Sequence, residues 1–137
     1  MKETTTAPMT PKWMYWTGWV LTVLLVLVFL MAGSMKIIQP DGGEGEPTFE
    51  EQFAQSGWPV HLAIWIGVIE ITCAVIYLIP KTAVSGAVLL TGFMGGAIAT
   101  HLRLEEPPIA QVIIGLVIWG ALWLRDAGVR ELLPLRR

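Results

Sequence analysis

The sequence predicts an all-α integral membrane protein: a four-transmembrane-helix bundle with a short amphipathic helix in the first outer loop. Two observations lead to this fold class. First, 54% of the 137 residues are hydrophobic and 15% are charged, and the mean hydropathy is +0.61. Second, the apolar residues form blocks of roughly the 20 residues that a helix needs to cross the hydrocarbon core of a bilayer. The length suits one domain, embedded in the lipid bilayer.

The first expected span covers residues 13–35, after a polar tail of residues 1–12. This span holds no charged residue. It is also longer than the roughly 7–15 apolar residues of a signal peptide, so we interpret it as a retained helix that ends before Pro40. Aromatic residues crowd its start, as they do at a membrane–water interface: Trp13, Tyr15, Trp16 and Trp19.

An acidic loop, residues 41–56, follows the first span. Thr48 and Glu51 have the spacing of a capping box, in which two side chains satisfy free amides at the start of a helix. Phe49 and Phe53 then fall one turn apart on one face. We therefore expect a short amphipathic helix that lies on the membrane surface or caps the bundle.

Three further spans are expected over residues 61–79, 83–102 and 109–124. Only Lys81 and Thr82 follow Pro80 before the third span begins, so the second and third spans should form an antiparallel hairpin. The four spans make one membrane domain, residues 13–124, and residues 125–137 form a second tail.

The basic residues predict the orientation of the bundle. Two Lys residues lie in the N-terminal tail, one in the hairpin turn, and four Arg residues in the C-terminal tail, against Lys36 and Arg103 on the other side. The positive-inside rule therefore places both termini in the cytoplasm and the acidic loop outside. Three more aromatic residues should join a belt on the cytoplasmic side: Tyr77, Trp119 and Trp123.

Glu70 stands in the middle of the second span. A charged residue at that depth costs roughly 2.5–3.5 kcal/mol on insertion scales, so an intramembrane carboxylate is a functional-site hypothesis by default. Small residues share its helix face and mark a helix–helix contact, so Glu70 should point into the bundle: Ala63, Gly67 and Ala74. Alternatively, a protonated Glu70 could be structural, hydrogen-bonded to Thr72, to Thr100 or to a backbone carbonyl.

Four other polar residues fall near the outer ends of their spans: Lys36, His101, Arg103 and Gln111. Glu70 lies deeper, ~13 Å below the outer surface at 1.5 Å per residue. This funnel could admit a small anionic or polar ligand, or a proton. The depth argues against a direct Lys36–Glu70 ion pair, and we expect water or His101 to bridge them. Alternatively, Lys36 and Arg103 only snorkel to the head groups and His101 is a structural hydrogen-bonding residue.

Gly92 and Gly96 form a GxxxG pair in the third span, and Thr100 stacks one turn further along. In membrane helices this spacing lets two backbones approach closely. We interpret the pair as a surface for tight helix packing.

Several functions are excluded by residue type. The chain has two histidines, His61 and His101, and one cysteine, Cys73, so we expect no metal site, no haem and no intrachain disulfide. The acidic loop lacks the spacing of a calcium loop. No soluble segment carries a basic cluster, so we expect no nucleic-acid partner.

Six segments stand out along the chain: residues 31–36, 57–59, 67–70, 77–80, 95–103 and 122–125. They read MAGSMK, GWP, GVIE, YLIP, GGAIATHLR and LWLR. In these segments the chain resembles the DoxX-like membrane proteins, small four-helix proteins of bacteria. The resemblance implies a multi-pass protein of the bacterial inner membrane. The segments contain the candidate ligand-binding or proton-carrying residues: Lys36, Glu70, Thr100, His101 and Arg103.

Some DoxX-like proteins look like subunits of quinone-linked sulfur-oxidising enzymes, and others look like accessory or assembly factors. No residue of this chain forms a redox centre, so we expect no catalytic residue and no covalently bound cofactor. By analogy with those relatives, the chain could be an accessory subunit that binds a quinone beside a membrane redox partner.

Three hypotheses for the function remain open. The first is a binding module whose outward-facing pocket takes a quinone, a lipid or a small polar ligand. Lys36, His101 and Arg103 would hold the head group and Glu70 would carry a proton. The second is a structural or assembly protein, in which the same residues lock helices together and the acidic loop docks a partner. The third is a proton-coupled transporter, which in so small a chain would require a homo-oligomer.

Overall fold

The computed structural model describes residues 9–132, and over that range its regular elements are all helices. The four long helices are α1 (Lys12–Ile38), α3 (Ala63–Leu78), α4 (Ala83–Arg103) and α5 (Ile109–Arg125). The short elements are α2 (Phe49–Gln55), α6 (Ala127–Leu132) and the 3-10 turns η1 (Val60–Leu62) and η2 (Pro80–Thr82). The predicted all-α class is confirmed.

Three helical segments are long and apolar enough to cross a membrane: Lys12–Ile38, Val60–Leu78 and Pro80–Arg103. The fourth long helix, α5, is apolar but has 17 residues. At 1.5 Å per residue it is about 25 Å long, against a hydrocarbon core of about 30 Å. The protein is therefore a helical membrane bundle with three segments of full spanning length and a shorter fourth helix.

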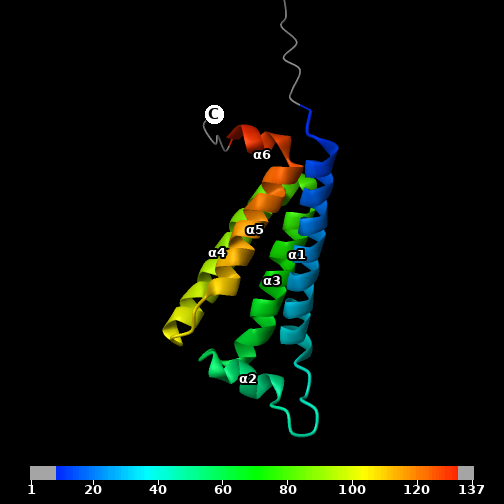
Figure 1. Cartoon of the computed structure of the whole chain (residues 1–137). Helices are drawn as coiled ribbons and strands as arrows, with labels where there is room; N and C mark the ends of the chain where they lie inside the picture. The colour runs from blue at the N-terminus through cyan, green and yellow to red at the C-terminus, as the bar shows by residue number, and fades with distance from the viewer. Residues whose placement is uncertain (1–8, 133–137) are drawn as a thin grey trace, which may run out of the picture.

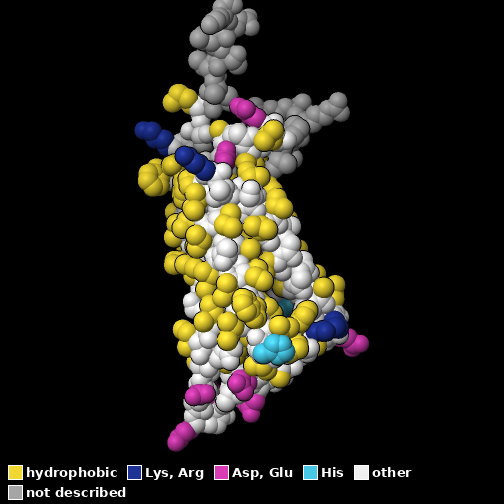
Figure 2. Space-filling model, turned by 180° about the vertical axis from the view of Figure 1, so that it is seen from behind, with side chains coloured by type: hydrophobic (Ala, Val, Ile, Leu, Met, Phe, Trp, Pro, Cys, Tyr) yellow, Lys and Arg dark blue, Asp and Glu magenta, His cyan; other side chains and the backbone are white. Residues whose placement is uncertain are grey.

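The long helices form a ring in which α1 and α4 each pack against α3 and α5. Figure 1 shows them converging at the end that carries α6 and separating toward the opposite end, where α2 crosses the bundle. We call these the α6 end and the α2 end. On the face shown in Figure 2, apolar side chains cover the length of the bundle and charged side chains gather at the two ends, as expected for a bilayer-embedded surface.

The predicted amphipathic helix is confirmed as α2. The Thr48 N–H donates to Glu51 Oε2 at 3.0 Å, and the Glu51 N–H donates to Thr48 Oγ1 at 3.3 Å, which completes the capping box. The rings of Phe49 and Phe53 stack with centroids 5.5 Å apart.

Glycines set the close contacts between helices. A Cβ built on Gly67 would lie 2.6 Å from the carbonyl oxygen of Gly33, so α1 and α3 touch backbone to backbone. A Cβ on Gly86 would lie 2.3 Å from the backbone nitrogen of Tyr77, which fixes the hairpin of α3 and α4. Small residues permit this proximity because no side chain separates the backbones.

Gly92 and Gly96 differ from these glycines. No described atom lies within 4 Å of a Cβ built on either residue. The prediction that this pair packs tightly against another helix is therefore wrong within the chain. The helices diverge toward the α2 end, so that face of α4 stays open.

The α6 end contains a buried polar cluster that sequence analysis missed. Tyr77, expected in an interfacial belt, is instead fully buried, and its hydroxyl donates to the Ile118 carbonyl at 2.7 Å. Arg125, assigned to the second tail, is the last residue of α5. Its Nη2 donates to the Tyr77 carbonyl at 2.7 Å, and its guanidinium lies 4.6 Å from the Trp19 ring centroid. Aromatic stacking and a helix-terminal carbonyl thus hold a buried cation where the helices converge.

Candidate functional site

A cavity of about 650 Å³ lies within the bundle at the α2 end. It is lined by α1, α3, α4 and α5, and is covered by α2 and the segment that leads into α3. Its volume falls within the range of pockets that bind small molecules. The cavity follows from the divergence of the helices, since backbone contacts hold the bundle closed only toward the α6 end and between α1 and α3.

Lys36 and Glu70 form a direct ion pair on the wall of this cavity. Lys36 Nζ lies 2.7 Å from Glu70 Oε2, and Glu70 is only 3% exposed. A second Lys36 hydrogen bond, of 3.3 Å, goes to the Ala32 carbonyl. The expectation that water or His101 would bridge the two side chains is therefore wrong.

The estimate of the Glu70 depth from helix rise misjudged the distance to Lys36 for two physical reasons. The contact between Gly33 and Gly67 staggers α1 and α3, so that Lys36 packs beside Gly67, one turn from Glu70. In addition, helix side chains lean toward the N-terminus of their own helix. Because α1 and α3 are antiparallel, Lys36 and Glu70 lean toward each other.

Neither threonine proposed as a partner of Glu70 contacts it. The Thr72 hydroxyl donates to the Val68 carbonyl at 2.7 Å, and the Thr100 hydroxyl donates to the Gly96 carbonyl at 3.0 Å. Oε1 of Glu70 accepts no hydrogen bond from residues 9–132. The ion pair thus keeps an unused acceptor, and the Lys36 ammonium has a third N–H to offer.

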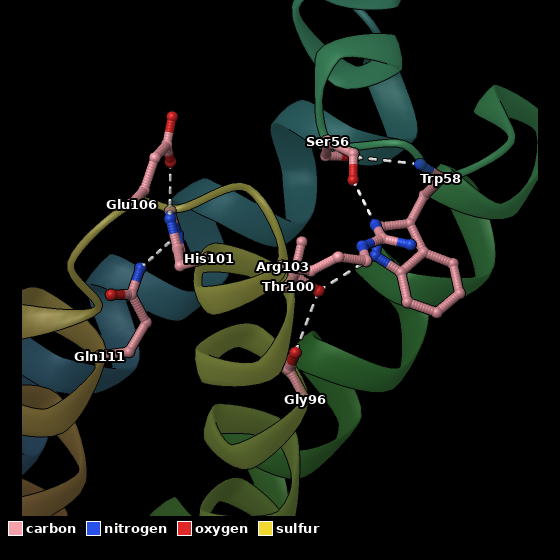
Figure 3. A network of polar contacts seen from close by, with 8 residues as sticks. All are labelled: Ser56, Trp58, Gly96, Thr100, His101, Arg103, Glu106 and Gln111. Carbon is pink, nitrogen blue, oxygen red and sulfur yellow. Dashed lines mark hydrogen bonds and ion pairs between the residues drawn. The ribbon is translucent and has the colours of Figure 1, made fainter.

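The opposite wall carries a hydrogen-bonded chain of three side chains, which Figure 3 shows in detail. His101 Nδ1 lies 2.9 Å from Glu106 Oε2, and His101 Nε2 lies 2.7 Å from Gln111 Nε2. With the amide as donor, Nε2 accepts, so the ring proton is on Nδ1 and points to Glu106. His101 therefore links a carboxylate outside the cavity to an amide that lines it.

Trp58 and Arg103 join α4 to the segment that covers the cavity. The Trp58 indole N–H donates to Thr100 Oγ1 at 3.1 Å, and Arg103 Nη2 donates to the Ser56 carbonyl at 2.6 Å. The Arg103 guanidinium also lies 5.6 Å from the Trp58 ring centroid. Gly57, at φ +76°, makes the turn that lets Arg103 pack against this backbone.

The structure brings four of the five predicted site residues to the cavity: Lys36, Glu70, Thr100 and His101. Arg103 lies outside the lining and ties α4 to the Ser56 carbonyl. Sequence analysis placed Gln111, the one polar side chain in the fourth predicted span, at the outer mouth of the funnel but not among the five candidate residues. It did not single out Glu106, which follows the third predicted span. Within residues 9–132, no three His, Cys, Asp or Glu side chains gather as a metal site would require.

The match to the DoxX-like family model extends over residues 20–124, which is most of the chain and includes every residue that lines the cavity. Comparisons with curated proteins and with solved structures found no match. The resemblance carried by the sequence segments is confirmed. With its apolar helical bundle, the chain belongs to the DoxX-like family of membrane proteins.

Proposed function

We propose that this protein is a non-catalytic binding module of the bacterial inner membrane whose cavity takes a quinone, a lipid or a small polar ligand. The Lys36–Glu70 pair carries the proposal. Glu70 is buried and Lys36 is half-buried, the pair faces a cavity of about 650 Å³, and it retains one acceptor and one donor that the described residues do not use. Buried charges are costly unless they are fully hydrogen-bonded, so a pair with spare capacity beside a cavity favours a ligand.

In this function the two walls hold a polar head group between them. Lys36 donates to the ligand and Glu70 accepts from it or carries its proton. On the other wall the Gln111 amide and the Thr100 hydroxyl offer further hydrogen bonds, with His101 held in place by Glu106. Arg103 acts indirectly, by holding the cover of the cavity. An association with a membrane redox partner rests on the analogy with quinone-linked relatives alone.

Glu70→Gln tests this function. We expect the variant to remain folded, since an amide of the same shape still accepts from Lys36, but to lose the ligand-dependent rise in melting temperature that the wild-type protein shows with a panel of quinones and lipids. Gln52→Glu, in the exposed face of α2, is the control and should keep that rise. Unchanged thermal shifts in Glu70→Gln would contradict the proposal.

The second candidate is a structural or assembly role, in which the ion pair serves only to fasten α1 to α3. The observation that favours it is that several polar contacts around the cavity join different elements, as the Arg103–Ser56 and Trp58–Thr100 bonds do. Collapse of the Glu70→Gln fold, with no ligand found for the wild-type protein, would select this role.

The proposed orientation puts both termini in the cytoplasm and the α2 end outside. We expect a cytoplasm-active reporter fused after Arg137 to be active, and a reporter that requires export, fused at the same position, to be inactive. A cysteine introduced at Gly43 in the acidic loop, on a Cys73→Ala background, should react with an impermeant thiol reagent in intact cells. The reverse labelling pattern would overturn this orientation.

A further inference from the structure

The exposed part of the cavity lining lies mainly on one side of the bundle. Five of the six exposed lining residues lie along α3, along α4 or in the segment that leads into α3: Trp58, Trp65, Ile69, Gly92 and Gly96. Trp65 and Ile69 are 65% and 52% exposed, although both belong to a membrane-length apolar segment. The remaining exposed member, Val28, lies on α1. The cavity is therefore open toward the surface that faces lipid, and the opening lies between α3 and α4.

Gly92 and Gly96 give this opening its width on the α4 side. A Cβ at either position would meet no described atom within 4 Å, and both residues line the cavity. Glycine at both positions leaves the α4 backbone bare beside the cavity that Trp65 and Ile69 line from α3. In other membrane helices the GxxxG spacing lets two helices approach closely. Here the same spacing leaves open space beside α4.

The charges along the cavity select the kind of head group. Of the Lys, Arg, Asp and Glu residues in the described part of the chain, Lys36 and Glu70 line the cavity. Their opposite charges lie 2.7 Å apart and compensate each other. Arg103 is not part of the lining, and its guanidinium is engaged by the Ser56 carbonyl and the Trp58 ring. A charged head group would lose its hydration on entering the cavity and would meet no free counter-charge to compensate for that loss. An uncharged head group with hydrogen-bonding oxygens would meet a donor and an acceptor.

We propose that the ligand is an uncharged, single-chain membrane amphiphile that enters sideways from the bilayer, between α3 and α4, across Gly92 and Gly96. This inference rests on the proposed binding function and narrows it to a ligand class and a route. The head group reaches the Lys36–Glu70 pair, and the chain lies among apolar side chains that include Phe29 and Met94. Both residues are almost sealed from the outside, at 2% and 6% exposed.

A photo-crosslinking experiment tests the route. A monoacylglycerol with a diazirine in its chain is incorporated into nanodiscs with the full-length protein, and the labelled residues are located by mass spectrometry. In the wild-type protein we expect label on Phe29 and Met94, which a chain confined to the bilayer does not reach. In Gly96→Leu, label at these two positions should fall by about tenfold or more, because the new side chain overlaps the path. Label on the exposed Trp65 should persist and serves as the internal standard.

Gly95→Leu is the matched control, since Gly95 is exposed on the same helix with open space beyond its Cβ but does not line the cavity. It should label like the wild-type protein. Gly92→Leu is a second blocking variant, and melting temperatures show that each variant is folded. A diazirine fatty acid of equal chain length supplies the anionic comparison and should label Phe29 and Met94 weakly.

The outcomes separate this inference from the binding function. Equal interior labelling in Gly96→Leu, Gly92→Leu and the wild-type protein overturns the route, and equal labelling by the fatty acid overturns the ligand class. An unlabelled interior in the wild-type protein overturns both. None of these results alters the proposed binding function, which falls if Glu70→Gln leaves the ligand-dependent thermal shifts unchanged.

Discussion

Lys36→Met is expected to lower the free energy of unfolding by about 3 kcal/mol, because it leaves the Glu70 carboxylate buried without its partner. The additional replacement Glu70→Leu should recover most of this loss, since two apolar side chains of similar size need no charge compensation there. The measurement is a double-mutant cycle on unfolding in mixed detergent micelles.

The control for this cycle is Lys81→Met, which removes an exposed lysine from the turn between α3 and α4. It should change stability by less than about 0.5 kcal/mol. If the single variants Lys36→Met and Glu70→Leu have additive effects in the double variant, the two residues do not interact and the ion pair is not a determinant of the bundle.

Gly86→Ala is expected to cost about 3 kcal/mol or more, or to abolish the folded bundle. The new Cβ would lie 2.3 Å from the backbone nitrogen and 2.4 Å from the Cα of Tyr77, and neither atom can move without separating α3 from α4. Overpacking against side chains alone costs about 1–3 kcal/mol, and backbone gives way less readily.

Gly95→Ala is the matched substitution, on the same helix but with no described atom within 4 Å of its Cβ. It should leave stability unchanged or raise it by up to about 1 kcal/mol, because alanine has the higher helix propensity. Unfolding of the two variants is compared under the same conditions. Similar stability for both would contradict the assignment of Gly86 as the residue that closes the hairpin.

The two predictions concern opposite halves of one bundle. At the α6 end, backbone contacts and the buried Tyr77–Arg125 cluster hold the helices together. At the α2 end the helices diverge, and the contacts there include the Gly33–Gly67 contact and the ion pair between α1 and α3 and the His101–Gln111 contact between α4 and α5. The cavity thus lies in the diverging half, and the tightly packed half stands beneath it.

Local patterns in the sequence were sufficient to predict much of this architecture. The lengths of the apolar blocks gave the long helices, the Thr48–Glu51 spacing gave α2, and the small residues beside Glu70 gave its inward orientation. Each of these properties depends on residues a few positions apart, or on the summed hydrophobicity of one segment. The DoxX-like segments likewise identified the family, and four of the five candidate residues do surround one cavity.

Contacts between helices decided the rest. The Gly33–Gly67 contact sets the stagger that makes Lys36 and Glu70 a direct pair, and the divergence of the helices leaves Gly92 and Gly96 open and creates the cavity. At the α6 end the helices converge, and this buries Tyr77 and Arg125. Stagger and divergence depend on which residue of one helix meets which residue of the next, and spacing within a single helix does not determine that. The sequence alone thus determined the helices and the inward face of α3, and the tertiary structure alone decided which helix faces meet and where the helices separate.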